Sequence, residues 1–184
     1  MRNIIMTDIT QEYDYVKKQI PDPQVKDAAD QFWAAAELLR AQLPRSGVLL
    51  PTIVNSVLAL ELYLKSLSSY SVIKDLKDYG NGVRGGVVTA KPEKSTHKLS
   101  ELFDAADCWV RNDLESRYCQ STLCQSGKSL RDLFQRYDNV FVTVRYVYED
   151  SESLRSVNLP ELRQLAQFMK GAVETLPRKV TVLK

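Results

Sequence analysis

The stretch LLPTIVNSVLALELYLKSL, residues 49–67, is apolar around nearly the whole circumference of a helix. A helix with this pattern packs at the centre of a core rather than on its surface. It nevertheless carries Asn55, Glu61 and Lys65, and a polar group inside a core needs a partner or a function. The stretch therefore predicts the central helix of the fold and a first set of candidate functional side chains.

The composition is that of an ordinary globular domain. The chain has 184 residues, of which 44% are hydrophobic and 26% charged. A net charge of +2 does not by itself indicate nucleic-acid binding, which usually shows as a clustered basic patch or a far more basic domain. We expect one domain over residues 1–184, with its core over 22–176, an insertion over 70–95 and a C-terminal tail over 177–184.

The cysteines and the hydropathy of the chain predict the cellular compartment of the protein. Cys108, Cys119 and Cys124 are odd in number and form no paired framework, which favours free thiols in a reducing environment. The N-terminus lacks the apolar run of a secretory signal. The longest apolar stretch is interrupted by Asn55 and Glu61, so it does not suit a membrane span. The sequence predicts a cytoplasmic protein with no membrane partner.

Helical periodicity recurs along most of the chain. Asp22 followed by Pro23 is a helix start signal, and apolar spacings of three and four continue from there to Pro44. With a short link, this helix and the one over 49–67 form an antiparallel hairpin. Further helices are expected over 7–20, over 97–114 with Thr96 as the cap, from 130 after the capping box Ser129-x-x-Asp132, and over 159–176.

The secondary structure of two segments stays open. VFVTVRYVY, residues 140–148, is rich in β-branched and aromatic residues, which favours a strand. The same segment places Phe141, Val144 and Tyr148 on one helical face. Residues 178–183 suit either a short strand or a frayed tail.

A glycine-rich stretch, GNGVRGG, covers residues 80–86. Residues 72–76 and 87–90 flank it as a possible β-hairpin with Asn81-Gly82 as the turn. The surrounding segment is the most basic of the chain, with Lys74, Lys77, Arg84, Lys91, Lys94 and Lys98. The loop matches neither the P-loop nor the dinucleotide fingerprint. It is either a hairpin tip or a phosphate cradle, with Arg84 as its candidate binding residue.

His97 is the only histidine of the chain. General acid–base chemistry near neutral pH most often uses histidine, so His97 is a candidate catalytic residue. The sequence has no G-x-S-x-G nucleophile elbow and no metal-ligand spacing, and we therefore expect neither a metal nor another cofactor. The alternative for His97 is capping or packing at the start of a helix.

Glu61 and Lys65 are spaced i,i+4, which ordinarily gives a surface ion pair. In a central helix, a buried Glu61 needs a further partner. Arg145 is the expected one, because it also lies in an apolar and aromatic stretch and a guanidinium binds a carboxylate through two hydrogen bonds. The pair is either a polar lock between helices or an arginine held ready for a phosphate, with Tyr146 or Tyr148 beside it.

Three segments, in this order, resemble the helices of HEPN-like domains: NSVLALELYLKSL (55–67), HKLSELF (97–103) and FVTVRYVYE (141–149). The resemblance covers roughly residues 33–149. It implies an all-α fold, an up-and-down bundle of five to six helices, with a small Gly-rich β-hairpin or loop insertion near 72–90. It also implies that 130–150 is helical and that the protein is a homodimer in which the helix of Arg145 approaches its mate.

The nuclease members of this family carry an Arg followed four to six residues later by a His. Here Arg145 is followed by YVYEDS, and no histidine follows it. We therefore expect a non-catalytic or atypical domain that binds RNA, a nucleotide or a protein partner in a bacterial defence or toxin–antitoxin system. One alternative is a metal-independent endoribonuclease that uses Arg145 with Glu149, Tyr148 or His97. The other is a structural interaction domain. The candidate binding residues are Arg145, Tyr146, Tyr148, Glu61, Asn55, Lys65 and Arg84.

Overall fold

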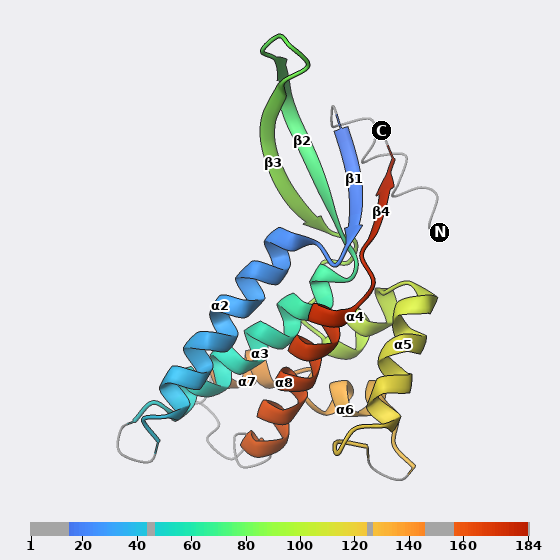
Figure 1. Ribbon diagram of the computed structural model, residues 1–184. Coiled ribbons are helices and arrows are strands. Elements are labelled where there is room, and N and C mark those ends of the chain that lie inside the picture. The colour runs from blue at the N-terminus through green and yellow to red at the C-terminus, as the bar shows by residue number, and fades with distance from the viewer. Residues whose placement is uncertain (1–14, 44–46, 125–126, 146–156, 184) are drawn as a thin grey trace.

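The computed structural model describes residues 15–43, 47–124, 127–145 and 157–183. Helices form a body, and a sheet rises from one end of it (Figure 1). The helices are α2 (Pro23–Arg40), α3 (Leu49–Ser66), α4 (Leu99–Ala105), α5 (Cys108–Cys119), α6 (Leu130–Arg136), α7 (Val140–Arg145) and α8 (Leu159–Thr175). The strands are β1 (Tyr15–Ile20), β2 (Ser69–Asp78), β3 (Arg84–Pro92) and β4 (Lys179–Val182).

The prediction of an all-α bundle is wrong. The strands form a four-stranded antiparallel sheet in the order β3-β2-β1-β4, so the fold is mixed. Strand β1 occupies the end of the segment predicted as a helix over 7–20. It pairs with β2 on one side and with β4, from the far end of the chain, on the other. Because both strands that pair with β1 are distant from it in sequence, the sequence near β1 contains no local pattern that indicates a strand.

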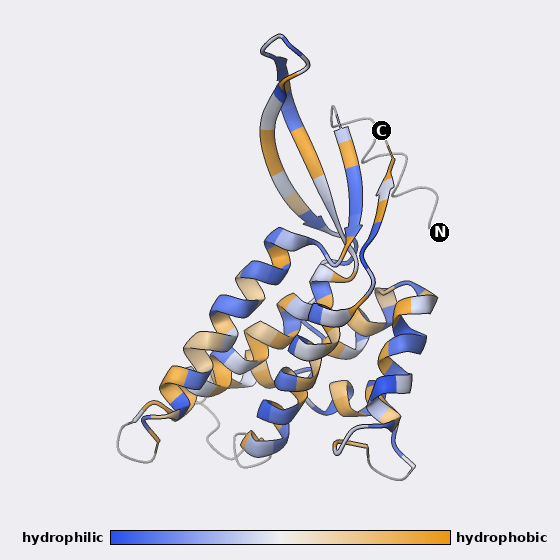
Figure 2. Ribbon diagram, in the orientation of Figure 1, coloured by the Kyte–Doolittle hydropathy of each residue, from blue (hydrophilic) through white to orange (hydrophobic). Residues whose placement is uncertain are grey.

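The predicted hairpin is confirmed and is longer than expected. Strands β2 and β3 contain residues 72–76 and 87–90, and Tyr79 N–H donates to the Val83 carbonyl across the tip at 2.9 Å. Asn81 and Gly82 have positive φ angles of 53° and 75°, as the turn prediction requires. Of the two alternatives for residues 178–183, the strand is the one present, as β4. Each strand carries both hydrophilic and hydrophobic residues (Figure 2).

Helix α3 is the centre of the core, as its sequence predicts. Its buried apolar side chains are Ile53, Val57, Ala59, Leu60, Tyr63 and Leu64, and it packs against α2, α4, α7 and α8. The predicted cap of α2 is also confirmed, because the Asp22 carboxylate accepts from Val25 N–H at 3.1 Å. Its second oxygen accepts from the Ser71 hydroxyl at 2.8 Å, which ties the sheet to the start of α2.

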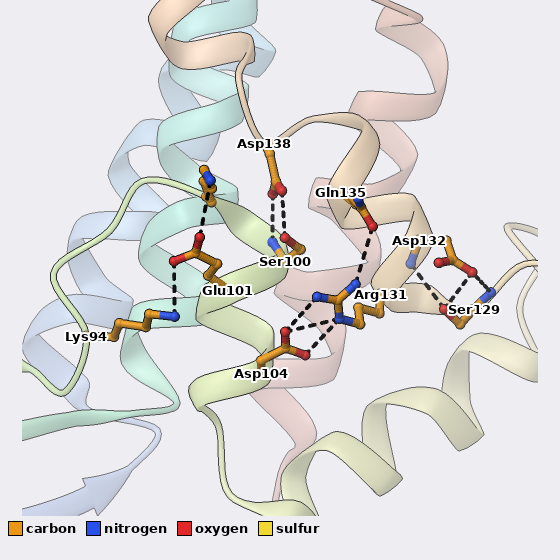
Figure 3. Close-up of polar contacts among 10 residues, drawn as sticks. Lys94, Ser100, Glu101, Asp104, Ser129, Arg131, Asp132, Gln135 and Asp138 are labelled. Carbon is orange, nitrogen blue, oxygen red and sulfur yellow. Dashed lines mark hydrogen bonds and ion pairs between the residues drawn. The ribbon is translucent and has the colours of Figure 1, made fainter. Parts of the chain in front are cut away.

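Two predicted helices are broken in the structure. The segment over 97–114 starts at Leu99 and divides into α4 and α5, because Ala106 and Asp107 are extended. The segment after 130 divides into α6 and α7, and its part beyond 145 lies outside the described residues. Tyr137 and Asp138, between α6 and α7, make tertiary hydrogen bonds. Tyr137 donates to the Glu161 carboxylate at 2.7 Å, and Asp138 accepts from the backbone and hydroxyl of Ser100 (Figure 3).

Within the described part of the chain, no helix combines the length and the apolarity needed to cross a bilayer.

Candidate functional site

Glu61 lies on the buried side of α3 with only 3% of its surface exposed. Its carboxylate is shared by two basic side chains. Lys65 Nζ donates to Oε1 at 2.6 Å, and His97 Nδ1 lies 3.0 Å from Oε1 and 3.2 Å from Oε2. Three of the predicted site residues therefore meet, two from α3 and one from the connection between β3 and α4.

His97 is held between elements that are distant in sequence. Its ring stacks on Phe141 of α7, with centroids 5.5 Å apart and an angle of 26° between the planes. Its side chain is nevertheless 60% exposed. The imidazole thus contacts α3 through its Nδ1 edge and α7 through one face, while much of the ring stays open to solvent.

The connection that carries His97 is fixed on α4 by Glu101. Lys94 Nζ approaches one Glu101 oxygen at 3.0 Å and Lys98 Nζ approaches the other at 3.3 Å, as Figure 3 shows for Lys94. The hydrogen bond from Lys94, followed by that from Lys98, lowers the pKa of the Glu101 carboxyl. Because these two lysines flank His97, their contacts limit where the imidazole lies.

Helix α4 is in turn fastened to α6. Arg131 makes paired hydrogen bonds to Asp104 at 2.8 to 3.1 Å, and the predicted capping box of Ser129 and Asp132 starts α6 (Figure 3). The contact with Arg131 fixes the last turn of α4, and the hydrogen bonds from Ser100 to Asp138 fix its first turn, which begins two residues after His97.

The chemistry of the site follows from the pairing of Glu61 with His97. A carboxylate accepts hydrogen bonds, so the histidine tautomer that satisfies the contact carries its proton on Nδ1. Nε2 is then the nitrogen available to a ligand, as an acceptor when the ring is neutral and as a donor when it is protonated. Lys65 adds a positive charge on the Glu61 carboxylate that holds the imidazole. The arrangement suits a hydrogen bond to a phosphate or the transfer of a proton.

Arg145 was the predicted partner of Glu61, and among the described side chains Glu61 pairs with Lys65 and His97. Arg145 is the last residue of α7, one helical turn after Phe141, and its side chain is outside what the structure describes. Tyr146, Tyr148 and Glu149 also lie outside the described residues.

Asn55 and Arg84 do not join the site. The Asn55 amide donates to the Pro51 carbonyl at 2.7 Å within α3, about 9 Å along the helix from Glu61. Arg84 lies at the tip end of the β2–β3 hairpin, where its Nε is 3.4 Å from the exposed carboxylate of Asp78 (Figure 1). The tip end is remote from the helical body that holds Glu61.

Sequence reasoning paired Glu61 with Lys65 but missed that His97 joins them. It also missed Phe141 as the aromatic partner of His97. No spacing rule joins residues 61, 97 and 141, because each comes from a different element. The one available signal was that each lies in one of the three segments on which the expected resemblance to HEPN-like domains rests.

No family model, curated protein or solved structure matches this chain. Among the described residues, no group of three or more His, Cys, Asp or Glu side chains is placed to hold a metal ion.

Proposed function

We propose that this chain is a HEPN-like domain that acts as a homodimer and binds RNA at the surface around Lys65, His97 and the end of α7. One observation carries the proposal. The three segments that resemble HEPN-like domains converge on a single point, with Glu61 from the first, His97 from the second and Phe141 from the third.

The chemistry at this point supports RNA as the ligand. Lys65 and the exposed edge of His97 offer hydrogen-bond donors to a phosphodiester, and Phe141 backs the imidazole so that it presents a flat face. RNA-binding surfaces commonly combine phosphate contacts with aromatic or imidazole planes on which bases stack. Arg145, at the end of α7, is the residue we expect to add a guanidinium to the same surface.

Exposure on α7 supports the homodimer. Val142 is 49% exposed on this short helix, although its neighbours Phe141 and Val144 are buried. An exposed valine next to Arg145 gives two copies of α7 an apolar contact across a two-fold axis. Val142→Glu is expected to shift the protein towards the monomer in light scattering after size exclusion, whereas Val88→Glu on the sheet should not.

Binding is tested with a fluorescent single-stranded RNA by anisotropy. Lys65→Gln and His97→Ala are expected to weaken binding about tenfold, which corresponds to the loss of one or two phosphate contacts. Lys170→Gln is the matched control, because Lys170 also pairs with a glutamate one turn away, but on α8. Affinity should fall steeply between 50 and 200 mM salt, by about one power of the salt ratio per phosphate contact. An affinity that changes neither with salt nor in the two site variants would refute the proposal.

The Glu61–His97 pair favours RNA cleavage as a second candidate function. A carboxylate that orients an imidazole is the arrangement of a general base. In this reaction His97 Nε2 takes the proton of a ribose 2′-hydroxyl, and the 2′-oxygen attacks the adjacent phosphorus. The bond to the 5′-oxygen breaks, and that oxygen takes up a proton, giving a 2′,3′-cyclic phosphate and a 5′-hydroxyl.

Cleavage is tested on purified protein with a defined RNA in the presence of a chelator. His97→Ala is expected to reduce the rate by about 10²-fold or more, and Glu61→Gln should reduce it by less. The cyclic phosphate end should appear by mass spectrometry. If wild type and His97→Ala cleave equally, the activity does not belong to this site and binding remains the only proposed function.

A further inference from the structure

Helix α5 ends beside a pair of cysteines that the site described above does not use. Cys119 is the last residue of α5, and Cys124 follows in the connection to α6. Both are free and exposed. The Cys124 thiol nevertheless lies within hydrogen-bonding reach of the Cys119 thiol.

Two consecutive turns bring the chain back onto the end of α5. Ser121 N–H donates to the Tyr118 carbonyl at 2.9 Å, and Cys124 N–H donates to the Ser121 carbonyl at 3.3 Å. Each cysteine directly follows a buried residue, Tyr118 in one case and Leu123 in the other. The core thus anchors the backbone just before each thiol and keeps the two thiols side by side at the surface.

We propose that Cys119 and Cys124 form a reversible intramolecular disulfide when the protein meets a peroxide. The inference stands on the geometry of α5 and does not depend on the proposed function.

The reaction has two steps. The sulfur of Cys119 attacks a peroxide oxygen and breaks the O–O bond, which gives a sulfenic acid and one molecule of water or alcohol. The sulfur of Cys124 then attacks the sulfenic sulfur, the S–S bond forms, and a second oxygen leaves as water. The two thiols lose two protons and two electrons, and the peroxide takes them up. A small-molecule thiol such as glutathione reverses the bond by exchange.

The two sulfurs have different roles. Local desolvation and the neighbouring Cys119 raise the pKa of the Cys124 thiol above its usual value. Cys124 therefore keeps its proton at neutral pH more firmly than an isolated thiol does. This direction favours Cys119 for the first attack and Cys124 for the resolving step, and the same disulfide forms in either order.

Cys108 supplies the matched control. It lies on the same helix and is also exposed, but it is the first residue of α5. Eleven residues separate it from Cys119, about 16 Å along the helix axis. A disulfide needs Cα atoms within about 7 Å, so Cys108 has no access to either partner.

The experiment treats the folded, reduced chain with hydrogen peroxide, blocks the remaining thiols with iodoacetamide and maps the products by mass spectrometry. Wild type and Cys108→Ser are expected to lose the mass of two hydrogens, to contain a linked peptide of Cys119 and Cys124, and to recover both thiols with dithiothreitol. Cys119→Ser and Cys124→Ser should take up oxygen atoms or join two chains instead. Circular dichroism confirms that all variants are folded.

Three results would overturn the inference. The first is wild-type protein that gains oxygen atoms without losing two hydrogens. The second is an intramolecular bond that contains Cys108. The third is a Cys119→Ser variant that closes an intramolecular disulfide as readily as wild type.

Discussion

Glu61 shows how one residue links the core to the candidate site. A buried carboxylate without partners costs several kcal/mol, so a helix that carries one in its core must supply contacts for it. Lys65, one turn further along α3, and His97, from the connection after β3, supply them. The buried carboxylate of Glu61, which would destabilise the core without partners, is therefore also the group that orients the exposed imidazole of His97.

The coupling between Glu61 and His97 is measurable. We expect a double-mutant cycle of Glu61→Gln and His97→Ala, followed by urea unfolding, to give an interaction free energy of about 1 kcal/mol. The same cycle with Glu61→Gln and Arg84→Ala is the control and should be additive, because Arg84 pairs elsewhere. If the first cycle is also additive, His97 is not held by Glu61. A loss of stability with unchanged RNA affinity would instead favour the structural interaction domain.

A second cluster of charged residues makes a pH-dependent contribution to the stability of the fold. Arg163 donates to both oxygens of Glu37 at 2.8 Å, and Arg40 donates to them at 3.1 and 3.0 Å. Hydrogen bonding from Arg163, opposed by desolvation and assisted by Arg40, lowers the pKa of Glu37 to about 2 from a usual 4.5. Because the folded pKa is the lower one, the pair stabilises the fold above the unfolded pKa and loses this effect as pH falls towards 2.

Glu37→Gln is expected to lower the free energy of unfolding by about 1 kcal/mol at pH 7, a modest value because the side chain is 28% exposed. The difference from wild type should shrink between pH 5 and pH 2 and vanish at the lower end. Urea unfolding at several pH values measures it. A difference that stays constant down to pH 2 would show that the ion pairs with Arg163 and Arg40 do not cause it.

At the scale of elements, the prediction from sequence succeeds where the signal is local. The predicted caps at Asp22 and Ser129 each involve a few consecutive residues, and both are present. The predicted cap at Thr96 is wrong, because α4 begins after Lys98 and, among the described residues, the Thr96 hydroxyl accepts only from Lys98 N–H. The breaks before α5 and α7 could not be predicted in this way. Tyr137 leaves the helix to donate to Glu161, which is 24 residues away, and nothing near Tyr137 in the sequence signals that contact.

The hairpin of β2 and β3 depends on a glycine for a reason the sequence does not show. A Cβ at Gly86 would lie 2.6 Å from Ile73 Cγ2 and 2.6 Å from the Lys74 carbonyl oxygen. The second contact is with backbone, so it is relieved only by moving a strand. Gly86 thus permits the close approach of β2 and β3 next to the irregular register between Lys74 and Lys77.

Gly86→Ala is expected to destabilise the fold by about 1–3 kcal/mol, measured as the free energy of urea unfolding. Gly47→Ala is the matched control, because a Cβ there meets nothing within 4 Å, and it should change stability by less than about 0.5 kcal/mol. Equal effects of the two substitutions would mean that the strands tolerate the side chain.

At the scale of the whole molecule, the charged residues are distributed unevenly, although the net charge is small. The strands carry seven Lys or Arg residues and two Asp, whereas the rest of the chain carries 18 basic and 21 acidic residues. The sheet is therefore the positive end of the molecule. The composition gives a net charge of +2 but does not say where the charges lie. They could be placed only once the pairing of strands from both ends of the chain was known.

The sheet also joins the start of the described chain to its end. Leu183 N–H donates to the Val16 carbonyl at 2.9 Å, and Thr181 lies opposite Lys18 while Val180 lies opposite Gln19. Amide directions alternate along an antiparallel strand, so Thr181 N–H points towards β1 and Val180 N–H points away from it. Neighbouring residues of β4 thus differ in whether their amides hold the two ends of the chain together.

This alternation predicts opposite outcomes for two proline substitutions. Thr181→Pro removes a hydrogen bond to β1 and is expected to lower the free energy of unfolding by about 1–3 kcal/mol, whereas Val180→Pro removes an amide that faces the open edge and should cost clearly less. Hydrogen exchange of the β1 amides should also speed up only in Thr181→Pro. Equal destabilisation by both prolines would mean that β4 contributes through side-chain packing, since only the Thr181 amide belongs to the ladder.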